Sequence, residues 1–182
     1  FNPKLTIIHS TTAPGITNIL TDLTEALIVH SPIRGIHPNL YEGLMTFVKF
    51  IGSDTIEAAE LAKSHCEELG ISPYICNSSR TTELGKLLST TYYGLAIAWH
   101  GEMQKICKQM GVSFDQAVTI FNETYNKGYQ KLDRGDVVRP VLYPPDGGIG
   151  GHCIIPNVEI LNNYSSSLVF ELIQQYEKGE VK

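Results

Sequence analysis

From about Ser79 to Gly111 the chain keeps apolar residues at helical spacing and contains no proline. At 1.5 Å per residue, this stretch predicts an uninterrupted helix about 45 Å long. Such a helix is long for a globular domain. It divides the 182-residue chain into a region before it and a region after it, and the two regions have different patterns.

The region before the long helix alternates between strand and helix patterns. Short apolar runs typical of strands occupy residues 5–9, 27–31, 46–53 and 72–78. Helical spacing follows the turn residues Pro14 and Gly15 in "TTAPGITNILTDLTEA" and returns in "DTIEAAELAKSHCEELG". We expect this second helix to begin at an Asp54 cap and to end at Gly70. Alternating strands and helices predict an α/β region with a largely parallel sheet.

The region after the long helix shows helical and loop patterns only. "SFDQAVTIFNETYNKG" predicts a helix with Ser113 as N-cap, Gln116 in the capping-box position and a stop at Gly128. A loop rich in Gly and Pro then covers residues 135–156, and a last helical segment lies near 165–178. The predicted fold class is therefore α/β followed by all-α.

Composition excludes several classes of partner. The net charge of −5, from 14 basic and 19 acidic residues with no basic run, predicts no nucleic-acid partner and no membrane partner. No apolar stretch approaches the roughly 20 residues that span a bilayer, and no signal-peptide pattern is present, so we expect a cytoplasmic protein. The cysteines are widely spaced, without C-x-x-C, so neither disulfides nor a metal site is expected. They are Cys66, Cys76, Cys107 and Cys153.

The stretch "PDGGIGGHCIIPN" places four glycines directly before His152 and Cys153. A glycine-rich loop allows backbone to approach a substrate closely, and a reacting cysteine must be reachable and nucleophilic. The alternative is a small, buried apolar cysteine in a turn. His152 is a poor candidate for a base that acts on Cys153, because adjacent side chains in extended backbone point to opposite sides.

Three motifs resemble the middle part of the nucleotide-sugar 6-dehydrogenases, the family of UDP-glucose, GDP-mannose and UDP-N-acetylmannosamine dehydrogenases. "GIGGHCI" at 148–154 is similar to the loop of the family's catalytic cysteine, "HSTTAPGIT" at 9–17 to a strand end of its NAD domain, and "ELGKLL" at 83–88 to the start of its long central helix. The resemblance implies part of a Rossmann-like NAD-binding domain at 1–79. It implies a long-helix, 6-phosphogluconate-dehydrogenase-like dimerisation domain at 80–182.

The family's reaction, as the resemblance implies it, oxidises a sugar primary alcohol to a carboxylate with two hydride transfers to NAD. A cysteine traps the aldehyde as a thiohemiacetal, and water later releases the acid from a thioester. The dinucleotide fingerprint G-x-G-x-x-G is absent from this sequence. The predicted strand at residues 5–9 begins almost at the first residue, and an interior strand needs neighbouring strands on both sides. We therefore expect a fragment of a longer NAD enzyme.

The resemblance assigns candidate roles to individual residues. Cys153 matches the nucleophile, Lys86 matches a lysine that stabilises an oxyanion, and Thr11 matches a threonine that holds the catalytic water. Lys86 could instead be a surface lysine that is solvated or paired with Glu83, and Thr11 could serve turn hydrogen bonds only.

Two further sets complete the candidate site. The expected cofactor contacts at the strand end are Ser10, Thr11, Pro14 and Gly15. The expected contacts to a nucleotide-sugar substrate are Gly148, Gly150, Gly151, Arg139, Thr90 and Asn157. Arg139 is the phosphate candidate, because it lies close to the glycine loop in sequence.

Three positions depart from the family's pattern. Thr90 replaces an asparagine, Asn157 replaces an aspartate that serves as a base, and Ile33 stands where a glutamate is expected. Asn157 cannot take up a proton at neutral pH, and Glu42 could replace the missing glutamate only if its loop is rearranged. The alternatives are therefore a single-hydride enzyme similar to the hydroxyacid dehydrogenases, or a non-catalytic ligand-binding or dimerisation protein.

The resemblance also implies a homodimer in which the long helix packs against its copy. Tyr92, Tyr93 and Trp99 lie at helical spacing, and we expect them in the core or in dimer contacts.

Overall fold

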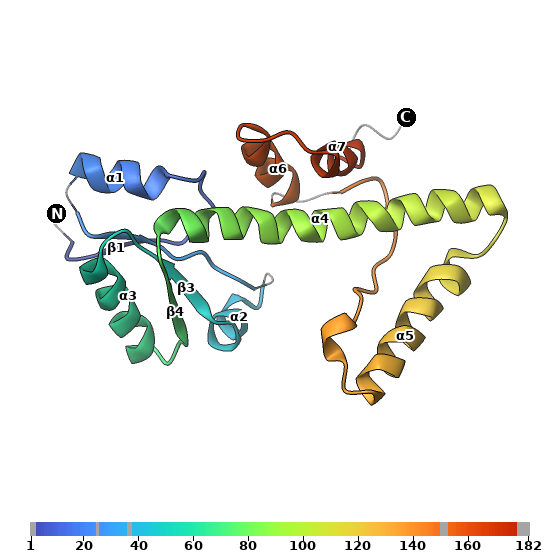
Figure 1. The fold of residues 1–182 in the computed structure, drawn as a ribbon, viewed down its shortest axis with the longest axis horizontal. Coiled ribbons are helices and arrows are strands. Elements are labelled where there is room, and N and C mark those ends of the chain that lie inside the picture. Colours follow the sequence, from blue (N-terminus) through green and yellow to red (C-terminus); the bar gives the residue numbers. More distant parts are fainter. Residues whose placement is uncertain (1–2, 25, 36–37, 150–152, 178–182) are drawn as a thin grey trace. The chain divides into compact units, whose positions relative to one another are not determined.

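The computed structural model describes residues 3–24, 26–35, 38–149 and 153–177. The chain forms two compact units, Phe1–Leu88 and Ser89–Lys182, and each is described by itself. The long helix α4, Ser79–Met110, contains the boundary between them (Figure 1). This helix confirms the predicted one, and Gly111 ends it with a positive φ of 67°. The division into domains at residues 79 and 80 stays a prediction.

The first unit contains a four-stranded sheet that confirms the four predicted strands. The strands, in their order across the sheet, are β1 Thr6–Ile8, β2 Ile28–His30, β3 Lys49–Gly52 and β4 Pro73–Cys76. The pairs β1·β2 and β3·β4 are parallel, but β2·β3 is antiparallel, so the sheet is mixed rather than largely parallel. A single pair of residues joins β2 to β3 in this ladder, His30 opposite Gly52.

Side chains hold the segment that follows β2 against β3. The Ser31 hydroxyl donates to the Phe50 carbonyl at 2.7 Å, and the Lys49 ammonium donates to the Pro32 carbonyl at 3.1 Å. Proline has no amide hydrogen for a ladder, so side-chain hydrogen bonds take its place here. The connection between the two strands also contains the short helix α2, Leu40–Thr46, which the sequence patterns do not predict.

Helix α3, Ile56–Glu68, covers the sheet and supplies most of the small residues of the core. The core cluster consists of Val29, Ile51, Ala58, Ala62 and Cys66. The predicted Asp54 cap is wrong: the side chain of Thr55 accepts from the Ala58 amide, while Asp54 accepts a hydrogen bond from the Ser79 hydroxyl. Gly70, with φ of 73°, ends the helix region as expected.

Helix α1, Ile16–Thr24, follows β1 and confirms the predicted helix. Its one buried residue is Thr17. The apolar residues that define its periodicity stay exposed in the described ranges, and these are Ile16, Ile19, Leu20 and Leu23.

His30 is fully buried in β2 and links three elements of the first unit. Its Nε2 lies 3.0 Å from the Ser10 carbonyl oxygen, and its Nδ1 lies 2.8 Å from the Thr82 hydroxyl oxygen. Because a carbonyl can only accept, Nε2 carries a proton in its contact with Ser10. Burial lowers the pKa of His30 below its usual value.

After α4, the second unit continues with a π-helical turn, η1, Asp115–Thr119, which leads into α5, Ile120–Lys131. The Ser113 hydroxyl oxygen accepts from the Gln116 amide at 3.4 Å, as the predicted cap requires. The predicted stop at Gly128 is wrong, because the helix continues for three further residues. A methyl group at Gly128 would meet no neighbouring atom within 4 Å, so this glycine marks neither a turn nor a close contact.

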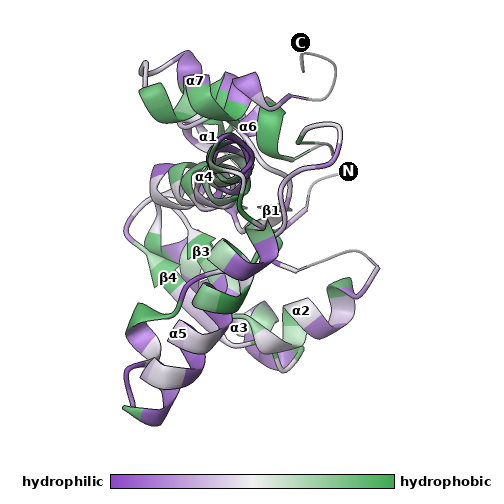
Figure 2. Ribbon diagram, turned by 90° about the vertical axis from the view of Figure 1, so that its right-hand side faces the viewer, coloured by the Kyte–Doolittle hydropathy of each residue, from purple (hydrophilic) through white to green (hydrophobic). Residues whose placement is uncertain are grey.

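Helices α6, Ile154–Asn162, and α7, Leu168–Gln175, close the second unit. Apolar residues predominate in both, as the hydropathy colours of Figure 2 show. Helix α7 confirms the predicted last segment. Helix α6 occupies part of the expected loop; its Pro156 lies in the first turn, where the helix needs no amide hydrogen from it. The short 3-10 turn η2, Gly135–Val137, precedes the loop.

Within the described ranges, none of the helices combines the length and the hydropathy that crossing a membrane requires.

Substitution of Gly52 should test how closely β3 packs against the start of α4. A Cβ atom there would lie 2.7 Å from the Ser78 carbonyl oxygen and 2.9 Å from the Ser79 Cα. We expect Gly52→Ala to lower the free energy of unfolding by about 1–3 kcal/mol. The matched control is Gly85→Ala on α4, where a Cβ meets open space and helix propensity should add about 0.5–1 kcal/mol. Urea denaturation measures both, and equal effects would contradict the packing argument.

The neutral, buried state of His30 predicts a pH dependence of stability. Because burial lowers its pKa in the folded chain, the unfolded chain binds the proton first as the pH falls below about 6.5. Stability should therefore decrease between about pH 7.5 and 5.5, and His30→Gln should flatten this dependence. Urea midpoints at both pH values measure it. His65→Gln, at an exposed histidine, is the control, and an unchanged slope in His30→Gln would refute the assignment.

Candidate functional site

The turn between β1 and α1 lies at the carboxyl end of a strand, where open α/β sheets usually bind ligands. It contains the residues predicted to contact a cofactor. Ser10 is exposed, Thr11 and Pro14 are half-buried, and Gly15 is buried with a positive φ of 99°.

A buried carboxylate from α4 holds this turn. The Glu83 side chain accepts from the Gly15 amide at 2.6 Å and from the Thr17 amide at 2.9 Å, and it also accepts from the Thr17 hydroxyl at 2.7 Å. A carboxylate is favourable there, because the first amides of a helix lack partners within the helix. This role was not predicted from the sequence, which suggested Glu83 only as a partner of Lys86.

The position of Glu83 decides what α1 can bind. An NAD pyrophosphate would use the free amides at a helix N-terminus. In this chain the Gly15 and Thr17 amides already donate to a carboxylate, which would also repel a phosphate. The residues of this turn therefore do not fit the phosphate part of NAD.

Lys86 lies almost one turn after Glu83 on α4 and is half-buried. Its ammonium donates to the carbonyl of Ile33 at 3.0 Å. Lys86 thus contacts the backbone of the position where the family's glutamate is expected. Glu42 is exposed in the first turn of α2. The oxyanion role of Lys86 and the water-holding role of Thr11 stay predictions.

A second lysine near this position was not identified from the sequence. Lys49 is buried in β3 and donates to the Ser31 carbonyl at 2.6 Å and to the Pro32 carbonyl at 3.1 Å. Burial lowers its pKa to about 8, and the charge of Lys86 contributes to the shift. Lys49 and Lys86 together donate to three consecutive carbonyls, those of residues 31–33.

In the second unit, Cys153 is the N-cap residue of α6, and its side chain is exposed. The alternative of a buried apolar cysteine is therefore wrong. Gly147 and Gly148 precede it with φ of 67° and 100°, a conformation that few other residues adopt. The predicted contacts Gly150 and Gly151, like His152, lie outside the described residues.

The other predicted substrate contacts have different surroundings. Asn157 is buried on α6, four residues after Cys153, and Thr90 is half-buried on α4, four residues after Lys86. The Arg139 guanidinium lies 3.7 Å from the centre of the Tyr125 ring. Their contacts with a substrate stay predictions.

A cavity of about 500 Å³ lies along α4 in the second unit. Its walls include Tyr92, Leu95, Trp99, His100, Asn122 and Arg139. Tyr92 is 68% exposed and Trp99 49%, so the expectation that they lie in the core is wrong. Tyr93 is 51% exposed as well. The dimer contact stays a prediction.

Cys153 belongs to the second unit, and Thr11 and Lys86 belong to the first. Within the described residues, no group of three or more His, Cys, Asp or Glu side chains could hold a metal ion. The second unit by itself has an exposed thiol at the N-cap of α6 and a buried amide four residues later on the same helix.

Known proteins resemble this chain in both sequence and fold. UDP-N-acetyl-D-mannosamine dehydrogenase of Methanococcus vannielii is 29% identical over 153 residues, which are 83% of this chain and 33% of that protein. The chain thus spans about a third of the length of the curated relatives it matches.

Two solved structures share the fold. The UDP-D-ManNAc dehydrogenase of Pyrococcus horikoshii has a TM-score of 0.73 at 23% identity, over 94% of this chain and 42% of that one. The 3-hydroxyisobutyrate dehydrogenase of Mycobacterium tuberculosis has a TM-score of 0.65 at 13% identity, over 97% and 64%. Both likenesses concern the fold and confirm the predicted α/β region followed by helices.

The central domain of one family covers more than half of the chain. Its sequence pattern matches residues 80–178, which contain the long helix, the glycine loop and Cys153. This chain belongs to the UDP-glucose/GDP-mannose dehydrogenase family.

Proposed function

We propose that this chain is a part of a cytoplasmic nucleotide-sugar 6-dehydrogenase and that Cys153 is its reacting thiol. One observation carries the proposal: the thiol is exposed at the N-cap of α6, directly after a glycine-rich loop. The match of residues 80–178 to the family's central domain supports it, and so do relatives whose substrates are nucleotide sugars by name.

The chemistry assigned to this chain is addition of the thiol to an aldehyde. The Cys153 thiol gives up its proton and its sulfur forms a bond to the carbonyl carbon; the electron pair of the C=O bond moves to the oxygen, which takes up a proton. Lys86 is the proposed cation near that oxygen, and Thr11 the proposed partner of the water. NAD would accept the hydrides of both oxidations, but the fingerprint that holds its pyrophosphate is absent from this sequence, so we assign no hydride step to residues of this chain.

Hydrolysis of a thioester also needs a base, and Asn157 cannot be that base, because an amide takes up no proton near neutral pH. A reaction with one hydride transfer avoids this step. A second candidate function is that of a non-catalytic ligand-binding or dimerisation protein. It is favoured by Asn157 and by Ile33, which stands in place of a glutamate. The reactivity of Cys153 separates the two candidates.

We also propose that α4 packs against its copy in a homodimer. The aromatic side chains of Tyr92 and Trp99 line a cavity and remain about half exposed or more. Large apolar side chains on one helix face are typical of a surface that is covered in the assembled protein. A second copy of the helix would present the same apolar groups.

An activated Cys153 should react faster than an ordinary thiol. At about pH 7, we expect iodoacetamide to modify Cys153 about tenfold or more faster than the same thiol in the urea-unfolded chain. Cys66 and Cys107 should react slowly because they are buried, and burial also raises the pKa of the Cys66 thiol. Mass spectrometry of tryptic peptides resolves the rates. A Cys153 rate equal to that of the unfolded chain would favour the non-catalytic candidate.

The dimer prediction concerns mass in solution. Light scattering should give twice the chain mass of 20.1 kDa, and Trp99→Glu should reduce it to the monomer value, because a charge would be buried at the contact. Gln109→Glu is the matched control: it adds the same charge to an exposed position of α4 that does not line the cavity. A monomer mass for the unmodified chain would refute the dimer.

A further inference from the structure

Tyr176, the residue that follows α7, lies directly against the backbone of α4. Its side chain is buried at 7% exposure, and a Cβ atom on Gly101 would come within 2.6 Å of its Cζ. The ring can occupy this place only because residue 101 has no side chain.

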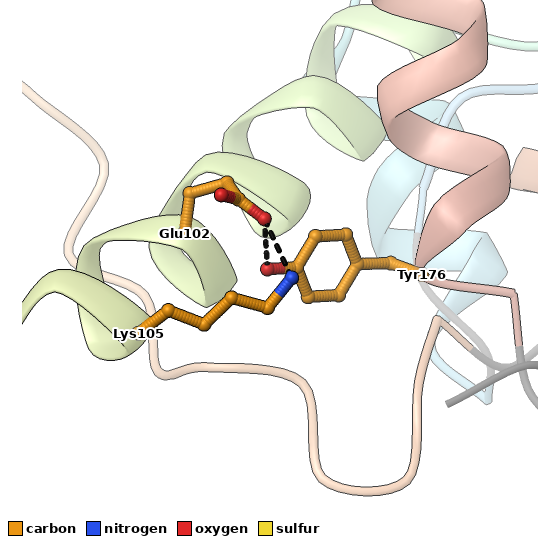
Figure 3. Close-up of polar contacts among 3 residues, drawn as sticks. All are labelled: Glu102, Lys105 and Tyr176. Carbon is orange, nitrogen blue, oxygen red and sulfur yellow. Dashed lines mark hydrogen bonds and ion pairs between the residues drawn. The ribbon is translucent and has the colours of Figure 1, made fainter. Parts of the chain in front are cut away.

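Two side chains of α4 hold the ring from its polar side (Figure 3). The Tyr176 hydroxyl donates to Glu102 Oε1 at 2.6 Å, and the Lys105 ammonium donates to the same oxygen at 2.8 Å. The ammonium also lies 4.5 Å from the ring centre, within the range of a cation–π contact. We call Tyr176, Glu102 and Lys105 the tyrosine clasp.

The ionisation of these groups suits their contacts. Burial raises the pKa of Tyr176, and its bond to Glu102 raises it further, so the hydroxyl keeps the proton that it donates. The hydrogen bonds from Lys105 and then from Tyr176 lower the pKa of Glu102, so its carboxylate stays an acceptor.

The backbone of Tyr176 connects the clasp to the glycine loop. The Ile149 amide donates to the Tyr176 carbonyl, and Ile149 forms a parallel bridge with Glu177. Ile149 is buried at 4% exposure. It is also the last described residue before Cys153. One residue thus attaches to α4 through its side chain and to the loop through its carbonyl.

The other end of the loop is held on α4 as well. Ile154, the first residue of α6, packs against Gly94, where an added Cβ would lie 2.5 Å from its Cγ2. Gly94 and Gly101 are seven residues apart, about two helical turns, so they lie on the same face of α4, about 10 Å apart. Ile154 is thus held directly on α4, and Ile149 is held through Tyr176 on the same face of this helix.

We propose that Tyr176 is a positioning residue for the thiol: the tyrosine clasp fixes Ile149 on α4 and thereby restricts where Cys153, four residues later, can lie. Its importance for the reaction rests on the proposed function of Cys153. The positioning itself can be measured without turnover.

The test uses a nitroxide spin label on Cys153 in the whole chain. A Cys76→Ser background removes the half-buried thiol, and the two remaining cysteines are buried. Tyr176→Phe removes the hydroxyl and keeps the ring and the carbonyl. We expect a more mobile nitroxide in its EPR spectrum. Glu102→Ala should reproduce the change, and Glu102→Gln, which keeps an acceptor, should restore most of the immobilisation.

The matched control is Tyr143→Phe, at a tyrosine of the same unit that is 68% exposed. Thermal denaturation of every variant separates local release of the loop from general loss of stability. If Tyr176→Phe unfolds the chain, the EPR spectra of Glu102→Ala and Glu102→Gln decide whether the tyrosine clasp positions Cys153. An unchanged line shape in Tyr176→Phe or in Glu102→Ala overturns the proposal, and so does the same change in Tyr143→Phe.

Alkylation of Cys153 in the same variants, without the label and with Cys76 present as an internal reference, links the clasp to reactivity. We expect Tyr176→Phe to lose most of the rate advantage of Cys153, while the Cys76 rate stays constant. Fast alkylation in both forms would support the reacting thiol and overturn the clasp's role. If the nitroxide becomes mobile in Tyr176→Phe but Cys153 of the unmodified chain is alkylated slowly, the reacting thiol is refuted. Tyr176 would then have no role in catalysis.

Discussion

Close packing against the backbone of α4 is the constraint on which both units depend. In the first unit, Gly52 lets β3 approach the start of this helix. In the second, Gly94 receives Ile154 and Gly101 receives the ring of Tyr176. Each contact requires a glycine, on the helix or on its partner, and none tolerates an added methyl group without movement of its neighbours. Within each unit, the part of α4 that belongs to it supplies this surface.

Buried charge, rather than apolar packing, determines what the β1–α1 turn can bind. The Glu83 carboxylate occupies the amides at the start of α1, and the ammonium groups of Lys49 and Lys86 occupy the carbonyls of residues 31–33. Buried ions persist only where such partners satisfy them. The Gly15 and Thr17 amides are therefore already hydrogen-bonded within the protein, which limits the ligands of the turn to groups that do not need these amides.

Sequence patterns predicted the four strands and the long helix, because each is a continuous apolar or periodic segment. They failed at residue types that occur both in loops and within helices. Pro156 indicated a loop but lies in the first turn of α6, and Gly128 indicated a stop but lies within α5. The motif around Cys153 located an exposed thiol, but the positions of Glu83 and Lys49 were not predictable. Their burial depends on elements that are distant in sequence, and a charged residue in a helix or strand usually indicates a solvated face.

The π-helical turn at Asp115–Thr119 has a consequence for the cavity wall. A π-turn accommodates one more residue than an α-helical turn, so it rotates everything that follows by about 100° relative to an unbroken helix. Asn122 on the cavity wall and Asn126, whose side chain bonds the backbone of Arg139, both lie after it. Without the π-turn, the same α5 sequence would present a different face to the cavity.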